Sequence, residues 1–209
     1  MSPRPVADVD ALRSDLLERA RTVVARDGVE GLTMRGLAAE AGTAVGLSYK
    51  AFSSREELLW KLTLSSLSEL ADQLDEWAAR PGGELAERLM EFHDLHQASL
   101  APDLVEHVSG GPRSQELLQR AADEGLIRSW TGIMSEFLRT RQSLGDVGED
   151  VDVEAFAFII TTALHHVLVT KAPFLAPDRH TLSRYVAGIA ARITTRTCRH
   201  RVDAREGRD

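Results

Sequence analysis

Apolar residues recur every three or four positions along most of this 209-residue chain, which is the spacing of an amphipathic α-helix. No window alternates convincingly between apolar and polar residues, as a half-buried β-strand does. The first periodic stretch carries Leu12, Leu16, Leu17, Ala20, Val23 and Val24. The sequence therefore predicts an all-α protein of about nine helices and no sheet.

Glycine, proline and capping residues divide this pattern into segments. Thr33 can cap one helix, and Ser54 with Glu57 forms a capping box directly before an apolar run. The long helix that starts there must end at Pro81-Gly82-Gly83. The expected helices cover residues 10–27, 34–41, 44–51, 54–80, 84–101, 102–108, 113–144, 153–171 and 178–199.

Three helices at the N-terminus are separated by Gly28, Gly31 and Gly42. A helix, a glycine-containing turn and a second short helix are what a helix-turn-helix requires, because the second helix must stand away from its support to enter the major groove. Gly42 permits the turn, and Gly46 allows the following helix to approach another backbone closely. The N-terminal region is therefore expected to bind DNA.

A long residue pattern supports this expectation. It runs from Thr33 to Gly42 as TMRGLAAEAG and continues with Gly46, Tyr49, Phe52 and SREEL at residues 54–58. This pattern closely resembles the TetR family of transcriptional repressors over about residues 12–62. The resemblance implies a DNA-binding domain at residues 1–53 and a helical ligand-binding and dimerisation domain at 54–199, and we expect residues 200–209 to be a disordered tail.

The resemblance also implies a function. It predicts a homodimer that binds a palindromic, double-stranded DNA operator and is released by a small-molecule inducer. Activation in place of repression stays open, as do the identities of the inducer and the operator.

Several positions of the recognition helix depart from the family's pattern. Ala44 stands where serine is usual, Leu47 where threonine is usual, and Ser48 where a buried aliphatic residue is usual. An apolar side chain can touch a thymine methyl, whereas tyrosine and lysine can bind phosphate oxygens. Ordinary packing or solvated charge is the alternative for the polar members of the set. The predicted DNA contacts are Thr33, Arg35, Thr43, Ala44, Val45, Leu47, Tyr49, Lys50, Ser54 and Arg55.

The net charge of −7 at first argues against a nucleic-acid partner, but its distribution does not. Residues 1–61 hold nine Lys or Arg and nine Asp or Glu, so this region is neutral. Residues 62–191 hold ten Lys or Arg and twenty Asp or Glu, and residues 192–209 hold six Lys or Arg and three Asp or Glu. The acidity belongs to the middle of the chain, which leaves room for a basic surface near the N-terminus.

Two later apolar stripes are candidates for a ligand cavity. His93 and His96 lie one turn apart on the apolar side of one expected helix, and buried imidazoles need partners. Helices at this place line the ligand cavity in TetR-like proteins, so the predicted ligand contacts are His93, His96, Trp130, Met134 and Phe137. A structural histidine pair is an equally good interpretation. A metal site, or a helical-bundle enzyme built on the two histidines, is a further alternative, although no third metal ligand is evident.

The last two expected helices carry apolar stripes with small residues between them. The equivalent pair forms a four-helix bundle across the two-fold axis in TetR-like proteins, which predicts a dimer interface at residues 153–197. A monomer core is the alternative. The predicted interface residues are Phe156, Ile160, Leu164, Tyr185, Ile189 and Ile193.

Other features exclude classes of protein. Cys198 is the single cysteine, the first ten residues lack the apolar region of a signal peptide, and residues 156–169 are too short to span a bilayer. No nucleophile elbow, phosphate loop, HExxH or di-metal carboxylate pattern occurs. We therefore expect a cytoplasmic regulator with no membrane partner, no cofactor and no enzymatic activity; a helical interaction module without DNA binding is the remaining alternative.

Overall fold

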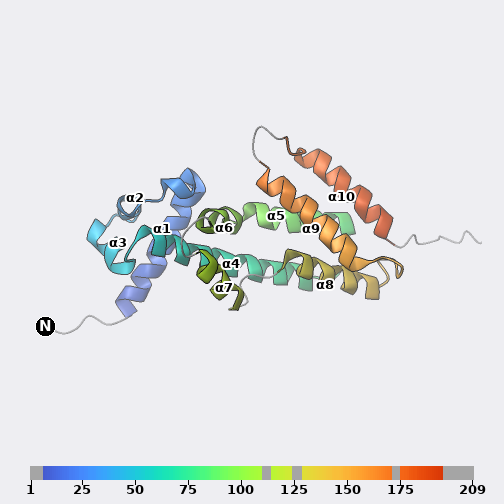
Figure 1. The fold of residues 1–209 in the computed structure, drawn as a ribbon, viewed down its shortest axis with the longest axis horizontal. Coiled ribbons are helices and arrows are strands. Elements are labelled where there is room, and N and C mark those ends of the chain that lie inside the picture. Colours follow the sequence, from blue (N-terminus) through green and yellow to red (C-terminus); the bar gives the residue numbers. More distant parts are fainter. Residues whose placement is uncertain (1–6, 110–113, 124–128, 171–174, 195–209) are drawn as a thin grey trace, which may run out of the picture. The chain divides into compact units, whose positions relative to one another are not determined.

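The computed structural model describes residues 7–109, 114–123, 129–170 and 175–194. These residues form ten α-helices (Figure 1) and a single β-bridge, between Val147 and Thr194, in agreement with the all-α prediction. No helix within these ranges has the length and apolar content needed to cross a membrane. The helices are α1 (Ala7–Gly31), α2 (Met34–Glu40), α3 (Val45–Ala51), α4 (Arg55–Ala79), α5 (Leu85–Ala98), α6 (Ala101–Ser109), α7 (Ser114–Asp123), α8 (Trp130–Ser143), α9 (Val153–Val169) and α10 (Arg179–Ile193).

The prediction of one continuous helix over residues 113–144 is wrong, because α7 and α8 are separate helices. The hydroxyl of Ser129 accepts a hydrogen bond from the backbone N–H of Gly132 at 3.2 Å, so Ser129 caps the start of α8. The apolar stripe continues across this point with nearly the same period, which concealed the boundary. The predicted tail at residues 200–209 lies outside the described residues.

The chain divides into two compact units, each described here by itself. The first unit comprises Met1–Gly82 and Met90–Ile133, and the second comprises Gly83–Leu89 and Met134–Asp209. Helices α4, α6 and α7 thus share a unit with the N-terminal helices. The predicted domain boundary after residue 53 is a functional division and stays a prediction.

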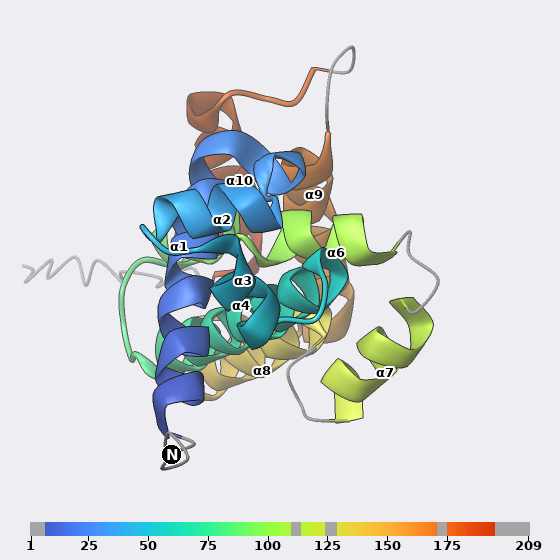
Figure 2. The same ribbon diagram turned by 90° about the vertical axis from the view of Figure 1, so that its left-hand side faces the viewer.

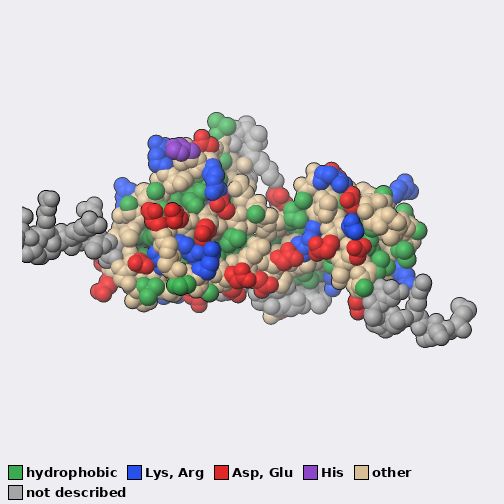
Figure 3. Space-filling model, turned by 180° about the vertical axis from the view of Figure 1, so that it is seen from behind, with side chains coloured by type: hydrophobic (Ala, Val, Ile, Leu, Met, Phe, Trp, Pro, Cys, Tyr) green, Lys and Arg blue, Asp and Glu red, His purple; other side chains and the backbone are tan. Residues whose placement is uncertain are grey.

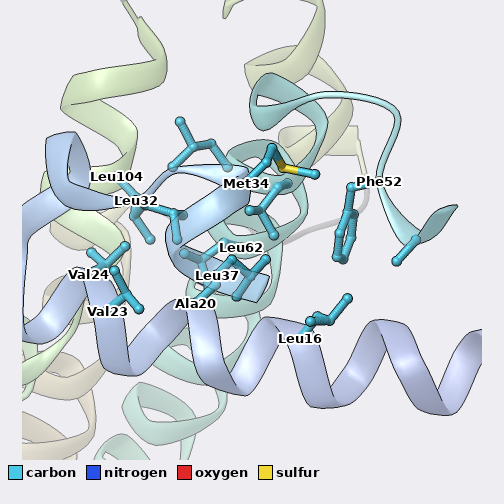
Figure 4. Packing of buried hydrophobic residues seen from close by; sticks show 13 residues of the cluster. Leu16, Ala20, Val23, Val24, Leu32, Met34, Leu37, Phe52, Leu62 and Leu104 are labelled. Atoms are coloured by element: carbon cyan, nitrogen blue, oxygen red, sulfur yellow. The ribbon is translucent and has the colours of Figure 1, made fainter. Parts of the chain in front are cut away.

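One core holds the N-terminal helices together in the first unit (Figure 4). Side chains along one side of α1 meet Leu37 from α2, Phe52 after α3 and Leu62 from α4. Leu104 brings α6 into the same core. Each fully buried leucine contributes roughly 1.5–3 kcal/mol of transfer free energy, so this core fixes the helices that surround it. The other members are Leu16, Ala20, Val23, Val24, Leu32, Met34, Ala51, Leu58 and Leu59.

The second unit is built on α8, α9 and α10. Asp152 and Asp178 cap α9 and α10, since their carboxylates accept hydrogen bonds from the backbone N–H groups of Ala155 at 3.0 Å and Thr181 at 2.7 Å. Arg141 of α8 donates to the carbonyl of Gly83 at 2.7 Å and lies 3.1 Å from the carboxylate of Asp146. These contacts tie the start of the unit to its centre.

Candidate nucleic-acid interface

The turn between α2 and α3 has the geometry that a helix-turn-helix needs. The hydroxyl of Thr33 accepts from the N–H of Gly36 at 2.9 Å and caps α2. Gly42 has a φ of 64°, a left-handed conformation that favours glycine. The N–H of Thr43 then returns to the carbonyl of Ala38 at 2.9 Å. Helices α2 and α3 therefore lie side by side across α1 (Figure 2).

Helix α3 presents one face to the core and another to solvent. Ser48 and Ala51 are buried, whereas Lys50 is exposed and Leu47 and Tyr49 are 38 % and 54 % exposed. Two large apolar side chains of one short helix are thus left in contact with water. A chain that keeps these two side chains in water presents a surface suited to a partner.

Ser48 is fully buried, and its hydroxyl has no hydrogen-bond partner among the described residues. A buried hydroxyl without a partner costs about 1–3 kcal/mol. The sequence showed a serine where an aliphatic residue is usual, and the structure shows that its position is the core-facing one. We find no physical reason for a serine at this position.

Ser54 begins α4 as predicted, because its hydroxyl accepts from the N–H of Glu57 at 3.1 Å. The carboxylate of Glu57 reaches back to Ser53, accepting from its N–H at 2.7 Å and its hydroxyl at 2.6 Å. These two hydrogen bonds lower the pKa of Glu57, so the carboxylate stays ionised. The cap that orients the loop after α3 is therefore intact at neutral pH.

The guanidinium of Arg55 is already occupied by contacts within the chain and is not available to a DNA phosphate. Its guanidinium donates to the carbonyls of Leu32 at 2.5 Å and Val29 at 2.8 Å, and it lies 3.8 Å from the carboxylate of Glu30. The same carboxylate is 3.3 Å from Nδ1 of His107 on α6. The arginine thus joins α4 to the end of α1 and to Leu32 directly after it, and the sequence motif alone could not distinguish this role from a DNA contact.

The other predicted DNA contacts fall into two groups. Arg35 and Ala44 are exposed, and Thr33 is exposed although its hydroxyl is used as the cap. Thr43 and Val45 are half-buried. A Cβ at Gly46 would meet no atom within 4 Å, so no contact within the chain requires glycine there.

Charges around this surface are mixed. Arg26 bridges α1 and α2, donating to Asp27 at 3.0 Å and to Glu40 at 3.1 Å, and these contacts raise its pKa. On α4 the exposed carboxylates of Glu69 and Asp72 lie further along the helix. Figure 3 shows that acidic side chains gather in rows on one face of the molecule. Glu69 and Asp72 are therefore solvated members of the acidic middle part of the chain.

Part of the predicted ligand site is a row of aromatic rings in the first unit. Trp77 of α4 lies 5.2 Å from Phe92, Phe92 lies 4.4 Å from His96, and His96 lies 4.1 Å from Trp130, measured between ring centroids. Nδ1 of His96 donates to the carbonyl of Phe92 at 2.7 Å. His93 is buried as well. Trp77 is not among the predicted site residues, although it lies on the apolar stripe of α4.

Met134 and Phe137, the other predicted ligand contacts, belong to the second unit and are buried there. The Phe137 ring lies 5.5 Å from the guanidinium of Arg88 and 6.0 Å from that of Arg141, both of which are also buried. Each arginine thus forms a cation–π contact with the ring. Arg88 could have been found from its position, because it interrupts an apolar stripe between Leu85 and Phe92.

The residues predicted for the dimer interface differ in burial, and the interface itself stays a prediction. Ile160, Leu164 and Ile193 are 2 %, 3 % and 1 % exposed, so they face the core of the second unit and offer no surface to a partner. Phe156 and Ile189 are half-buried, and Tyr185 is exposed. Phe158 and Ile159, which are not among the predicted interface residues, are 62 % and 50 % exposed on α9.

No group of three or more His, Cys, Asp or Glu side chains in the described part of the chain is arranged to hold a metal ion. The metal alternative for His93 and His96 therefore gains no support from their surroundings.

Comparison with known proteins agrees with this geometry. Residues 16–61 match the family of bacterial regulatory proteins called the tetR family. An HTH-type transcriptional regulator of Bacillus subtilis (strain 168), YfiR, is 30 % identical over 169 residues, which is 76 % of this chain and 78 % of that protein.

Solved structures show the same fold. A transcriptional regulator from Saccharomonospora viridis in complex with choline has a TM-score of 0.63 at 21 % identity, covering 90 % of this chain and all of that one. A TetR-family regulator from Cytophaga hutchinsonii has a TM-score of 0.64 at 15 % identity, covering 92 % and 100 %.

The capped helix-turn-helix, its exposed recognition face and the helical remainder define a transcriptional regulator. The chain belongs to the TetR family.

Proposed function

We propose that this regulator is a repressor that binds a palindromic operator as a homodimer and is released by a small molecule. The exposed face of α3 carries the proposal, because Leu47, Tyr49 and Lys50 project from a helix whose opposite face is fixed in the core. In this arrangement Leu47 reads bases, while Tyr49 and Lys50 contact phosphates. Two protomers would place two such helices about one DNA turn apart.

Replacing Lys50 by alanine is the test of the DNA-binding surface. Loss of one phosphate contact should weaken binding to all sequences and reduce the slope of log affinity against log salt by roughly one unit. Fluorescence anisotropy with a promoter fragment and a scrambled duplex, over a range of salt, measures both quantities. Arg139→Ala, which removes one positive charge from the exposed surface of α8, is the matched control and should leave the slope unchanged. A changed base preference in Lys50→Ala would contradict the phosphate role.

For the inducer we propose a site beside the aromatic row of the first unit. The rings of Phe92, His96 and Trp130 pack against one another there, and aromatic rings are the groups that an apolar molecule or a small organic cation would contact. The solved relative with choline makes that cation a reasonable first probe. The predicted contributions of Met134 and Phe137 stay predictions.

A double variant, His96→Ala with Trp130→Phe, tests the inducer site. The ligands used are those that a screen finds to release the parent protein from its operator. For the double variant, the ligand concentration needed for release should rise by at least about tenfold, provided that the variant keeps its fold and operator affinity. A ligand can release DNA only through a difference in affinity between two states, so bound operator should weaken ligand binding by the same factor. Normal release of the double variant would place the inducer elsewhere.

The homodimer is proposed to form through the exposed side of α9 and α10. Phe158, Ile159 and Tyr185 are large apolar side chains that the second unit leaves in contact with water. Such a group of side chains is a sign of a protein interface.

A further inference from the structure

Arg21 of α1 lies between α1 and α4 in the first unit. Its guanidinium donates to the hydroxyl of Ser65 at 2.6 Å and to the carboxylate of Glu69 at 2.5 Å, and both partners belong to α4. The carboxylate of Glu18, one turn earlier on α1, lies 3.2 Å from its Nε. The side chain of Arg21 is 16 % exposed, so these contacts are largely shielded from water. None of these residues is assigned above to DNA or to the inducer.

Three successive regions of α4 hold α1, which crosses the first half of this helix (Figure 1). Arg55, the first residue of α4, binds backbone carbonyls at the end of α1 and directly after it. Residues 58–62 then supply leucines to the shared core. The contact of Ser65 and Glu69 with Arg21 follows one to two turns later. The two polar attachments are thus about 21 Å apart along the helix axis, with the core between them.

The core and the polar attachments restrain the crossing of α1 and α4 in different ways. Apolar burial is non-directional, so the core alone allows the two helices to rock about their contact. A guanidinium presents its donors in a rigid fork, which fixes the direction of its partners. Because a partly exposed ion pair contributes little to stability, the main effect of the Arg21 contact is on the angle between the helices.

This angle matters because α4 continues beyond Glu69 to Ala79. The distance along the helix from Leu62 to Ala79 is about 25 Å, so a tilt of about 8° about the core moves the far end by about 3.5 Å. Neighbouring base pairs are about 3.4 Å apart along the duplex. A small tilt at the Arg21 contact therefore shifts the DNA-reading helix, relative to the end of α4, by about one base pair.

We propose that Arg21 is a positioning residue that sets the half-site spacing accepted by this protein. The inference rests on the proposed function, since spacing has a meaning only for a dimer on a palindrome. Arg21 holds α1, and with it the core that carries α2 and α3, at one angle to α4. Without the guanidinium, Glu18 and Glu69 would lose the cation between them, and their repulsion would favour separation of the two helices.

The experiment uses the full-length protein and a palindromic duplex that this protein selects from a random DNA library. Two further duplexes have their centre lengthened or shortened by one base pair, and a third keeps a single half-site. One base pair changes the half-site separation by about 3.4 Å and turns one half-site by roughly 35° against the other. The parent protein should therefore bind the altered centres at least about tenfold more weakly, as fluorescence anisotropy measures.

Arg21→Ala should bind the selected palindrome about tenfold more weakly, because a loosened pair of helices must be ordered on binding. Its loss of affinity for the altered centres should shrink to about threefold or less, because a head that can tilt adapts to either spacing. Its affinity for the single half-site should stay within about twofold of the parent's, with the same salt dependence. A merely structural role would weaken the binding of every duplex alike.

Two matched variants make the assignment specific. Ser65→Ala with Glu69→Ala removes the partners from α4 and leaves α1 intact, so it should show the same reduced spacing preference. Adding Arg21→Ala to this pair should change nothing further, because all three residues belong to one contact. Arg19→Ala is the control and should behave as the parent, since Arg19 pairs with Asp15 within α1 at 3.7 Å and both are exposed.

A folded Arg21→Ala protein that keeps the parent's spacing preference would overturn the proposal. So would one that loses half-site affinity and about one unit of salt slope, because Arg21 would then be a phosphate contact. Circular dichroism establishes folding, and Ser65→Ala with Glu69→Ala decides the matter if Arg21→Ala does not fold. A parent protein that binds the half-site as tightly as the palindrome would contradict the proposed function itself, and the inference would fall with it.

Discussion

Replacing Leu37 by alanine is expected to destabilise the first unit by about 3 kcal/mol and to abolish operator binding at physiological temperature. Leu37 is fully buried at the centre of the core that joins α1, α2 and α4 (Figure 4). Truncating a buried leucine removes its transfer free energy and leaves a cavity, which together cost about 2–5 kcal/mol. Urea denaturation followed by circular dichroism measures the change in the free energy of unfolding.

Leu47→Ala is the matched control, because it removes the same atoms from an exposed position on α3. Its free energy of unfolding should stay within about 0.5 kcal/mol of the parent protein. Its operator affinity should fall, most strongly for sites with a thymine under α3. Equal destabilisation by the two substitutions would show that the recognition helix is not held as described.

Local chemistry made the N-terminal region predictable from the sequence. Thr33 and Ser54 cap their helices as expected, and Gly42 adopts the left-handed conformation that the turn requires. Each feature depends on residues within four positions of one another, so the sequence contains it directly. The role of Arg55 could not be obtained in this way, because its hydrogen bonds reach Val29 and Leu32 across more than twenty residues.

Periodicity was less informative where a helix is apolar on more than one side. Helix α9 carries Phe158 and Ile159 beside Ile160, so its sequence offers two apolar faces and does not say which one is buried. Packing within the second unit decides this, and it buries Ile160. The same limitation hid the boundary between α7 and α8, where one apolar stripe runs through a break that Ser129 caps.

The exposed apolar residues of the second unit allow the proposed dimer interface to be tested. Replacing Phe158 by aspartate is expected to convert the proposed homodimer to a monomer. Phe158 is 62 % exposed on α9, and the two-fold symmetry of a dimer would place the substitution at the interface twice. Loss of a central aromatic contact costs about 2 kcal/mol or more, so two copies should raise the dimer dissociation constant roughly a thousandfold.

Sedimentation velocity over a range of protein concentrations measures that constant, and circular dichroism establishes that the variant is folded. Leu144→Asp is the control, since Leu144 is 61 % exposed after the end of α8 and should leave the dimer unchanged. Operator affinity should fall together with dimerisation, because a monomer reads only one half-site. A folded Phe158→Asp protein that sediments as an unchanged dimer would move the interface away from this face of α9.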